Sequence, residues 1–195
     1  MSSPKARVRR APKGGAPTAA PRHPRTKTKT TPVCETGRRT TGSDAWWRAF
    51  LRRERSIGSL HGITPIERIG LVRSGVPAAA MGIIAVDMGI AKEKLYVTLG
   101  MPRATIERKA RHQQRLSPDE GERVIGLARL IGQVDQIIHE SGNPDGFDSA
   151  RWVAAWLDRP LPALGGHRPG TLMDTAEGRE VVARFIAQMQ SGAYA

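Results

Sequence analysis

The last third of the chain contains the sequence Trp152-Val-Ala-Ala-Trp156-Leu157, followed by Pro162-Ala-Leu164-Gly165-Gly166 and then by Leu172-Met-Asp174-Thr175-Ala-Glu-Gly178. The two ends of this stretch have helical spacing, whereas its middle is rich in glycine and proline, which interrupt helices. The pattern therefore predicts two helices on either side of a turn. Asp174 or Thr175 is expected to cap the second helix.

This second helix is predicted to be amphipathic, because its apolar residues recur at three- and four-residue steps. They are Gly178, Val181, Val182, Phe185, Ile186 and Met189. The polar residues that are expected to stay outside are Glu177, Arg179, Glu180, Arg184, Gln188 and Gln190. The apolar face must be covered, so the helix is predicted to pack against another element.

The order and spacing of these residues resemble a known domain. Trp156-Leu157, Pro162-x-Leu164-Gly165-Gly166, Pro169, Leu172-x-Asp174-Thr175-x-x-Gly178 and a final Gly192-x-Tyr194 are similar to the toxin-binding domain of the Xre/MbcA/ParS antitoxins. The resemblance implies a partner, a RES-domain toxin that either degrades NAD or uses it to ADP-ribosylate a target. It also implies that the C-terminal region of this chain holds that toxin inactive.

The resemblance further implies that the turn and the last residues of the chain contact the toxin. The residues so implied are Trp156, Leu164, Gly165, Gly166, Arg168, Pro169, Leu172, Gly192, Tyr194 and Ala195. A chain end that is flexible when free can become ordered in a partner's cleft, so we expect inhibition by covering the active site. The residues alone leave another interpretation open, in which Trp152, Trp156 and Phe185 only form the core of a small helical subdomain.

A second pattern, at residues 91–112, predicts a helix-turn-helix. Gly100 suits the sharp turn, and the apolar residues that would hold the two helices together are Leu95, Leu99, Met101 and Ile106. The stretch resembles the Xre-like N-terminal domain of the same antitoxins. Tyr96 departs from the pattern, because a small residue is usual there. We expect its ring either to widen the helix crossing or to turn outward.

The second helix of this motif is predicted to read DNA. Ile106 and Ala110 should face the core, and the expected DNA-binding residues are Arg103, Thr105, Arg108, Lys109 and Arg111, with His112 beside them. Arginine suits guanine edges and phosphates, whereas lysine suits phosphates. The alternative is a basic, solvated helix in a domain that has kept its fold and lost operator binding.

Capping signals predict the remaining helices. Asp44 is expected to cap a helix that holds Trp46, Trp47 and Phe50, and Thr64-Pro65 should start the next one. The longest helix should begin at Ser117-Pro118 and end before the break at residues 141–146. Its apolar stripe is wide enough for more than one neighbour. It is expected either to link two domains or to pair with a second copy.

The charge of the chain is concentrated at one end. The formal net charge is +13, and residues 1–42 hold eleven basic residues against the single acid Glu35. This segment has few large apolar side chains, so we expect a disordered basic tail, with a role in phosphate binding or none. The predicted organisation is all-α: the tail at 1–42, an Xre-like helical domain at 43–141 and a toxin-binding domain at 146–195.

Catalytic and metal-binding patterns are missing from the sequence. The five histidines stand at no metal-ligand spacing, and the single cysteine, Cys34, cannot form an intrachain disulfide. We therefore expect no catalytic residue, no metal and no cofactor, and a binding protein rather than an enzyme. No apolar run is long enough for a membrane helix, so a soluble, cytoplasmic protein is expected.

The expected partners are the RES-domain toxin and operator DNA, with a homodimer of this chain inside a hetero-oligomeric complex. Autoregulation of the operon would follow from DNA binding. The alternative function is a helix-turn-helix transcriptional regulator whose C-terminal domain only dimerises. A basic architectural protein that works through residues 1–42 is a third interpretation.

Overall fold

The computed structural model describes residues 42–142 and 144–190. The predictions made for the basic tail and for Cys34 lie outside these residues. Every element of the described chain is a helix, and the extended segments contribute only an isolated bridge between Pro77 and Arg115. The predicted all-α fold is confirmed.

The helices follow one another with short connections. In chain order they are α1 (Gly42–Leu51), η1 (Ile57–Leu60), α2 (Pro65–Ser74), α3 (Ala80–Asp87), α4 (Lys92–Thr98), α5 (Arg103–Arg111), α6 (Pro118–Glu140), α7 (Ser149–Leu157), η2 (Pro162–Leu164), η3 (Pro169–Leu172) and α8 (Ala176–Gln190), where η marks a 3₁₀ helix. Residues 42–142 and 144–190 belong to the same compact unit, which runs from Arg38 to Ala195.

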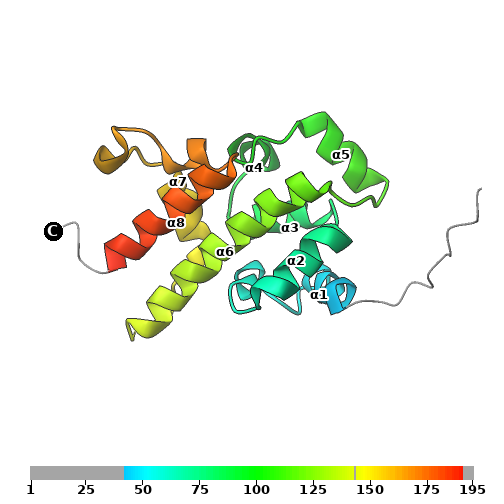
Figure 1. Ribbon diagram of the computed structural model, residues 1–195, viewed down its shortest axis with the longest axis horizontal. Coiled ribbons are helices and arrows are strands. Elements are labelled where there is room, and N and C mark those ends of the chain that lie inside the picture. The colour runs from blue at the N-terminus through cyan, green and yellow to red at the C-terminus, as the bar shows by residue number, and fades with distance from the viewer. Residues whose placement is uncertain (1–41, 143, 191–195) are drawn as a thin grey trace, which may run out of the picture. The chain divides into compact units, whose positions relative to one another are not determined.

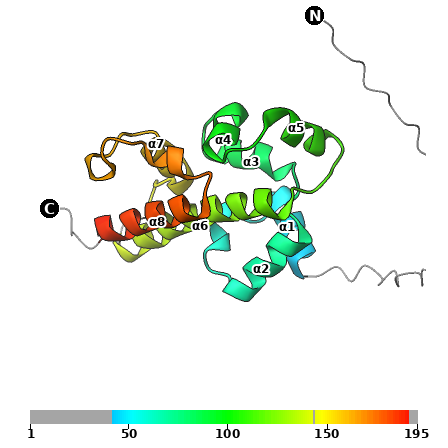
Figure 2. The same ribbon diagram turned by 45° about the horizontal axis from the view of Figure 1, so that its top comes forward.

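The long helix α6 is the centre of this unit. It packs against η1 and α2 on one side and against α7 and α8 on the other, and Figure 1 shows it running diagonally between them. In the turned view α8 again lies along the C-terminal half of α6 (Figure 2). The wide apolar stripe predicted for this helix is thus shared among several neighbours within one chain. The division of function between residues 43–141 and residues 146–195 stays a prediction.

A glycine permits the tightest crossing on α6. A side chain at Gly132 would clash with the carbonyl oxygen of Gly58 in η1 and with His61. The absence of a Cβ therefore lets the backbone of η1 lie directly on the helix. Nearby, Trp46, Trp47 and Phe50 of α1 form an aromatic cluster in the core, with ring centroids 4.8–5.9 Å apart.

Most of the predicted caps are confirmed. Thr64 and Ser117 each form a capping box, in which the hydroxyl accepts from the backbone of Glu67 or Glu120 and that glutamate accepts from the cap's own N–H. Of the two residues expected to cap α8, Thr175 does so, and its Oγ1 accepts from Gly178 N at 3.0 Å.

The cap predicted at Asp44 is wrong. Helix α1 begins two residues earlier, at Gly42, so Asp44 lies inside the first turn. Its carboxylate instead pairs with Arg115, at 2.7 Å, across the fold. An acid in the first turn is still favourable there, because it faces the positive end of the helix dipole.

Two predictions for α8 need correction. Arg179 was expected outside, but it is half-buried, and its guanidinium donates to the carbonyl of Met173 at 3.1 Å. Met189 was placed on the covered face, yet its side chain is 46% exposed. The middle of the apolar face is buried as predicted, at Gly178, Val182 and Ile186.

Candidate functional site

The turn between α7 and α8 has a defined backbone. Gly165 and Gly166 both have positive φ angles, 62° and 83°, which glycine adopts without strain. Gly166 N donates to Leu161 O at 2.9 Å, and Leu161 N donates to His167 O at 3.1 Å. The glycine pair therefore closes a short loop that projects from the helices, as the sequence pattern predicted.

Two other glycines hold this turn against its helices. A Cβ at Gly170 would lie 2.9 Å from the carbonyl oxygen of Leu157, and one at Gly178 would clash with the carbonyl oxygen of Leu172. The 3₁₀ turn η3 is therefore wedged between the end of α7 and the start of α8. The sequence motif included Gly178 without revealing this contact, and Gly170 was missed, although a glycine directly after Pro169 was a visible signal.

The structure divides the predicted toxin-binding residues by exposure. Gly165, Gly166 and Arg168 are exposed, and Leu164 and Leu172 are half-buried. Gly192, Tyr194 and Ala195 lie outside the described residues.

Trp156 and Pro169 are buried instead of being part of the accessible surface. Only 4% of Trp156 is exposed, and its ring stacks on Trp152 with centroids 6.0 Å apart. Helical spacing places Trp156 on the face of α7 that meets the core. The toxin-binding role of the whole set stays a prediction.

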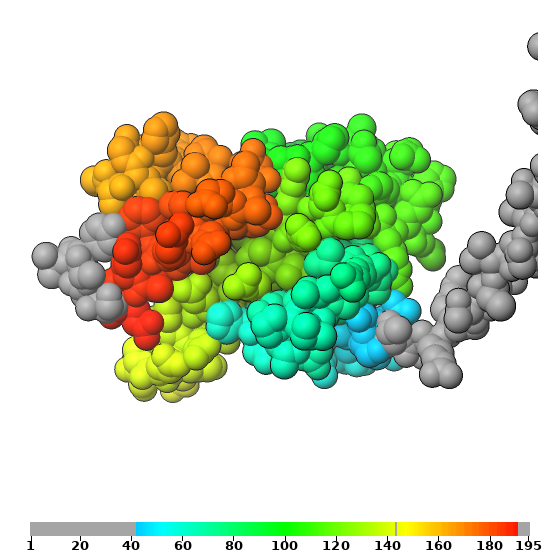
Figure 3. All heavy atoms as spheres, in the orientation of Figure 1, coloured from blue at the N-terminus to red at the C-terminus, as the bar shows by residue number. Residues whose placement is uncertain are grey.

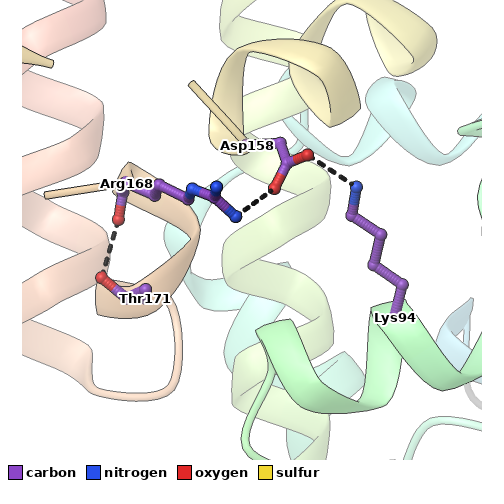
Figure 4. Close-up of polar contacts among 4 residues, drawn as sticks. All are labelled: Lys94, Asp158, Arg168 and Thr171. Carbon is purple, nitrogen blue, oxygen red and sulfur yellow. Dashed lines mark hydrogen bonds and ion pairs between the residues drawn. The ribbon is translucent and has the colours of Figure 1, made fainter. Parts of the chain in front are cut away.

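Asp158, the residue after α7, connects the turn to the helix-turn-helix. Its carboxylate accepts from Lys94 Nζ of α4 at 3.1 Å and from the Arg168 guanidinium at 3.3 Å (Figure 4). Thr171 Oγ1 in turn donates to the Arg168 carbonyl at 2.7 Å. The hydrogen bond from Lys94, its charge and that of Arg168 lower the pKa of Asp158. No sequence pattern indicated this bridge, because its partners are far apart in the chain.

The helix-turn-helix forms as predicted, from α4 and α5. Leu95, Leu99 and Ile106 are fully buried between the helices, and Gly100 has a φ of 59° at the turn. Arg123 of α6 donates to the carbonyls of Leu99 and Gly100 at 3.0 and 2.7 Å. These bonds satisfy the carbonyls at the end of α4 and fix the turn to the central helix.

Tyr96 does not turn outward. Its side chain is only 3% exposed, and the ring is part of the core, which excludes the outward one of the two expected arrangements. Burial raises the pKa of Tyr96, and the neighbouring carboxylates of Glu107 and Glu93 raise it further. Arg103 lies between the same two acids, with ion pairs of 3.0 Å to Glu93 and 2.9 Å to Glu107.

The five predicted DNA-binding residues are not equally available. Arg103 is occupied by its two glutamates, and Lys109 pairs with Glu120 of the α6 capping box. Thr105 is half-buried. Arg108 and Arg111 are exposed, and no ion pair forms at either within residues 42–142 and 144–190. Their positive charges therefore face solvent.

The turn of the helix-turn-helix also touches the start of α8. A Cβ at Gly100 would lie 2.8 Å from Cβ of Asp174, just before Thr175. Asp158 and Gly100 thus bring the two predicted binding regions into contact at two separate points. The part of the chain that the structure describes holds no cluster of three His, Cys, Asp or Glu suited to a metal ion. None of its helices is long and apolar enough to cross a bilayer.

Comparison with protein families defines the class of this chain. Residues 67–129 match the antitoxin Xre-like helix-turn-helix domain, and residues 145–192 match the antitoxin Xre/MbcA/ParS C-terminal toxin-binding domain. The first match contains α4 and α5, and the second contains the turn between α7 and α8. The chain belongs to the Xre/MbcA/ParS antitoxin family, and is an antitoxin of a toxin–antitoxin system.

Two curated relatives support this assignment. The chain is 42% identical over 137 residues to the Prs ADP-ribosylating antitoxin of Sphingobium sp. (strain YBL2), which covers 70% of this chain and 86% of the relative. It is 24% identical over 123 residues to the antitoxin Xre of Yersinia enterocolitica (serotype O:8 / biotype 1B), which covers 63% and 78%. Members of this family are antitoxins and not themselves enzymes, so the prediction of a binding protein is confirmed.

Proposed function

We propose that this antitoxin neutralises a RES-domain toxin that consumes NAD or uses it for ADP-ribosylation. The observation that carries the proposal is the match of residues 145–192 to a toxin-binding domain, together with a 42% identical relative whose name joins an antitoxin to ADP-ribosylation. The closely packed helices and glycines present a short exposed loop. Such a surface suits binding to another protein.

Neutralisation is proposed to occur by covering the toxin's active site. The exposed Gly165, Gly166 and Arg168 would lie at the rim of the contact, and the last residues, Gly192 to Ala195, would enter the pocket. A rigid loop costs little conformational entropy on binding, whereas a chain end orders at a cost that its new contacts must exceed. The loop would therefore provide most of the affinity and the chain end most of the occlusion.

The experiment is NAD turnover by the toxin encoded beside this gene, with and without the purified full-length antitoxin. We expect activity to fall in proportion to added antitoxin until the toxin is saturated. A variant that lacks Gly192 to Ala195 should still bind the toxin while leaving more residual turnover. If the truncated chain protects fully, occlusion by the chain end is wrong. If the full-length chain neither binds nor inhibits, the neutralisation proposal fails.

Autoregulation through operator binding is the second part of the proposal. Exposed Arg108 and Arg111 on α5 favour DNA contact, because their charges are not matched by acids within the described residues. A homodimer of the chain would place two copies of α5 on a symmetric operator. The DNA-binding function is assigned to residues 43–141 and toxin binding to residues 146–195.

A further inference from the structure

A groove of about 680 Å³ runs over α6 between α2 and α8. In the space-filling view the yellow-green atoms of α6 lie between the red atoms of α8 and the teal atoms of α2 (Figure 3). We name it the α2–α8 groove and define it by Ile69, Arg68, Arg129, Gln133, Arg179 and Ala183. One wall belongs to the toxin-binding domain, whereas the other wall and the floor contain residues of the helix-turn-helix match.

Apolar side chains form one edge of this groove. Ile69 is 44% exposed in the wall, and Ile66 on the same helix is 77% exposed beside it. Ile125 and Leu130 lie in the floor, and Ala183 and Ala187 line the opposite wall. Two neighbouring isoleucines open to solvent leave a helix face without a partner, and such patches commonly mark interaction surfaces.

The charges in the groove are unbalanced toward the positive side. Four arginines line it, Arg68, Arg129, Arg179 and Arg184, against the two acids Glu122 and Glu180. Arg68 donates to the carbonyls of His61 and Ile63, and Arg179 donates to the carbonyl of Met173, so backbone oxygens hold both guanidinium groups in place. Glu122 and Asp174 offset part of the charge of Arg179, and Arg184 pairs with Glu177 at 3.7 Å. Arg129 is exposed, with no ion pair to any residue in 42–142 or 144–190.

The arginines are held in place by packing. Gly126 of α6 makes room for the side chain of Arg179, which a Cβ there would meet at 2.5 Å. Gln133 donates to the carbonyl of Ala183 at 3.0 Å and ties α8 to the floor. Burial, and then the charge of Arg129, lower the pKa of Arg68, and burial followed by the charge of Arg123 lowers the pKa of Arg179. Like charges kept close in a groove attract an anionic partner.

We propose that the α2–α8 groove is a second docking surface for the toxin and receives an acidic segment with an apolar face. The proposal rests on the proposed function, because the toxin is taken as the owner of that segment. It follows from the surplus of arginines and from continuity with α8, which lies in the matched toxin-binding domain.

Two other occupants suit the groove less well. A second copy docking here would bring its own arginine surplus against the first, and like charges across an interface are costly. Residues 1–42 of this chain are strongly basic and would be repelled for the same reason. A toxin segment in the groove would touch both matched domains at once.

The test measures toxin affinity by calorimetry for full-length variants of the groove and matched controls. Arg129→Glu reverses an exposed charge in the groove, and Arg55→Glu makes the same change at an exposed arginine outside it. Ile69→Asp places a charge on the exposed apolar edge, and Val86→Asp does so at a 63% exposed valine of α3. All four positions are exposed enough to tolerate the change, and thermal melting verifies folding.

We expect each groove variant to weaken toxin binding about tenfold or more, with the two controls close to the wild-type chain. The loss in Arg129→Glu should shrink at high salt, because it is electrostatic. The inference is overturned if both groove variants bind the toxin like the wild-type chain. It is also overturned if they change only the oligomeric state of the free chain or only its affinity for DNA.

The wild-type chain separates this inference from the proposed function. If it forms no complex with the toxin, both fail together. If it binds and inhibits while the groove variants do the same, only the docking surface is wrong. The variant that lacks Gly192 to Ala195 and the groove variants should also affect different measured quantities. The former should chiefly raise residual turnover, and the latter should chiefly lower affinity.

Discussion

Lys94 of α4 donates a 3.1 Å hydrogen bond to Asp158, which follows α7, and so connects the helix-turn-helix domain to the toxin-binding domain. Asp158 also accepts from Arg168, a residue of the predicted toxin contact. One carboxylate therefore lies between the two binding regions. Because all three side chains are about half exposed, water and salt screen the bridge, and its main effect is to orient Arg168.

Asp158→Asn should lower the melting temperature slightly and weaken toxin binding through a less ordered Arg168. The pKa of Asp158 is lowered in the folded chain, so its contribution to stability is present above the ordinary Asp pKa of about 3.9. That contribution is lost as the pH falls through the lowered value. Melting curves of both proteins across this acidic range should therefore converge at low pH. A difference that grows as the pH falls would contradict the assignment.

Gly178→Ala should destabilise the chain by about 1–3 kcal/mol or more, as overpacking does. The new methyl would clash with the carbonyl oxygen of Leu172 and with Thr175, the cap of α8. Gly82→Ala in α3 is a matched control, because its nearest neighbour there is the flexible end of Lys92 at 4.0 Å. The control should be neutral or slightly stabilising, by up to about 1 kcal/mol. Urea unfolding measures both, and equal effects would contradict the close approach at Gly178.

Glu120→Gln should destabilise the start of α6 by about 1–2 kcal/mol, because the amide can keep the capping-box hydrogen bond but loses the charged pair with Lys109. Burial would raise the pKa of Glu120, but hydrogen bonds from Lys109 and from Ser117 outweigh it and lower the pKa. The stabilisation is therefore present above the ordinary Glu pKa and lost as the pH falls through the lowered value. Urea unfolding at neutral and acidic pH should show a smaller difference from wild type under acid. A constant difference would mean that charge is not involved.

Replacing Arg108 and Arg111 together by alanine should weaken operator binding and reduce its salt dependence, by about one unit of slope for each phosphate that the variant no longer binds. Arg103→Ala should matter less, because Arg103 is already paired with Glu93 and Glu107. Fluorescence anisotropy with DNA from upstream of the gene, over a range of salt concentrations, measures both. Equally weakened binding would show that Arg103 leaves its glutamates to bind DNA. An unchanged double variant would favour a domain that no longer binds an operator.

Local features of the fold could be predicted from the sequence because they depend on residues close together in the chain. The capping boxes at Thr64 and Ser117 each involve residues three positions apart, and the turn at Gly100 needs one residue with a positive φ. The apolar periodicity of α8 was equally local, and its centre is buried as predicted. The order of the motif residues was sufficient to indicate the antitoxin family, which the two domain matches confirm.

The predictions that were wrong concern residues whose surroundings are not revealed by helical spacing. Asp44 pairs with Arg115 instead of capping, and Arg179 turns inward, where it donates to the Met173 carbonyl and lies against Gly126 of α6. Tyr96 is buried, which excludes one of the two arrangements expected for its ring. Helical spacing places a residue on a face but does not say what lies opposite that face. The same limit explains why Trp156 was assigned to a contact surface although α7 directs it into the core.

The sequence by itself thus determined the helices and most of their caps, since these depend on contacts within a few residues. The order of its motif residues also indicated the antitoxin family. Only the tertiary structure decided which charges remain available. Packing pairs Lys109 with Glu120 but leaves Arg108 and Arg111 facing solvent. It also brings Lys94 to Asp158 and opens the α2–α8 groove beside Arg129. These relationships join segments far apart in the sequence, and they exist only once α6 has gathered both sets of helices around it.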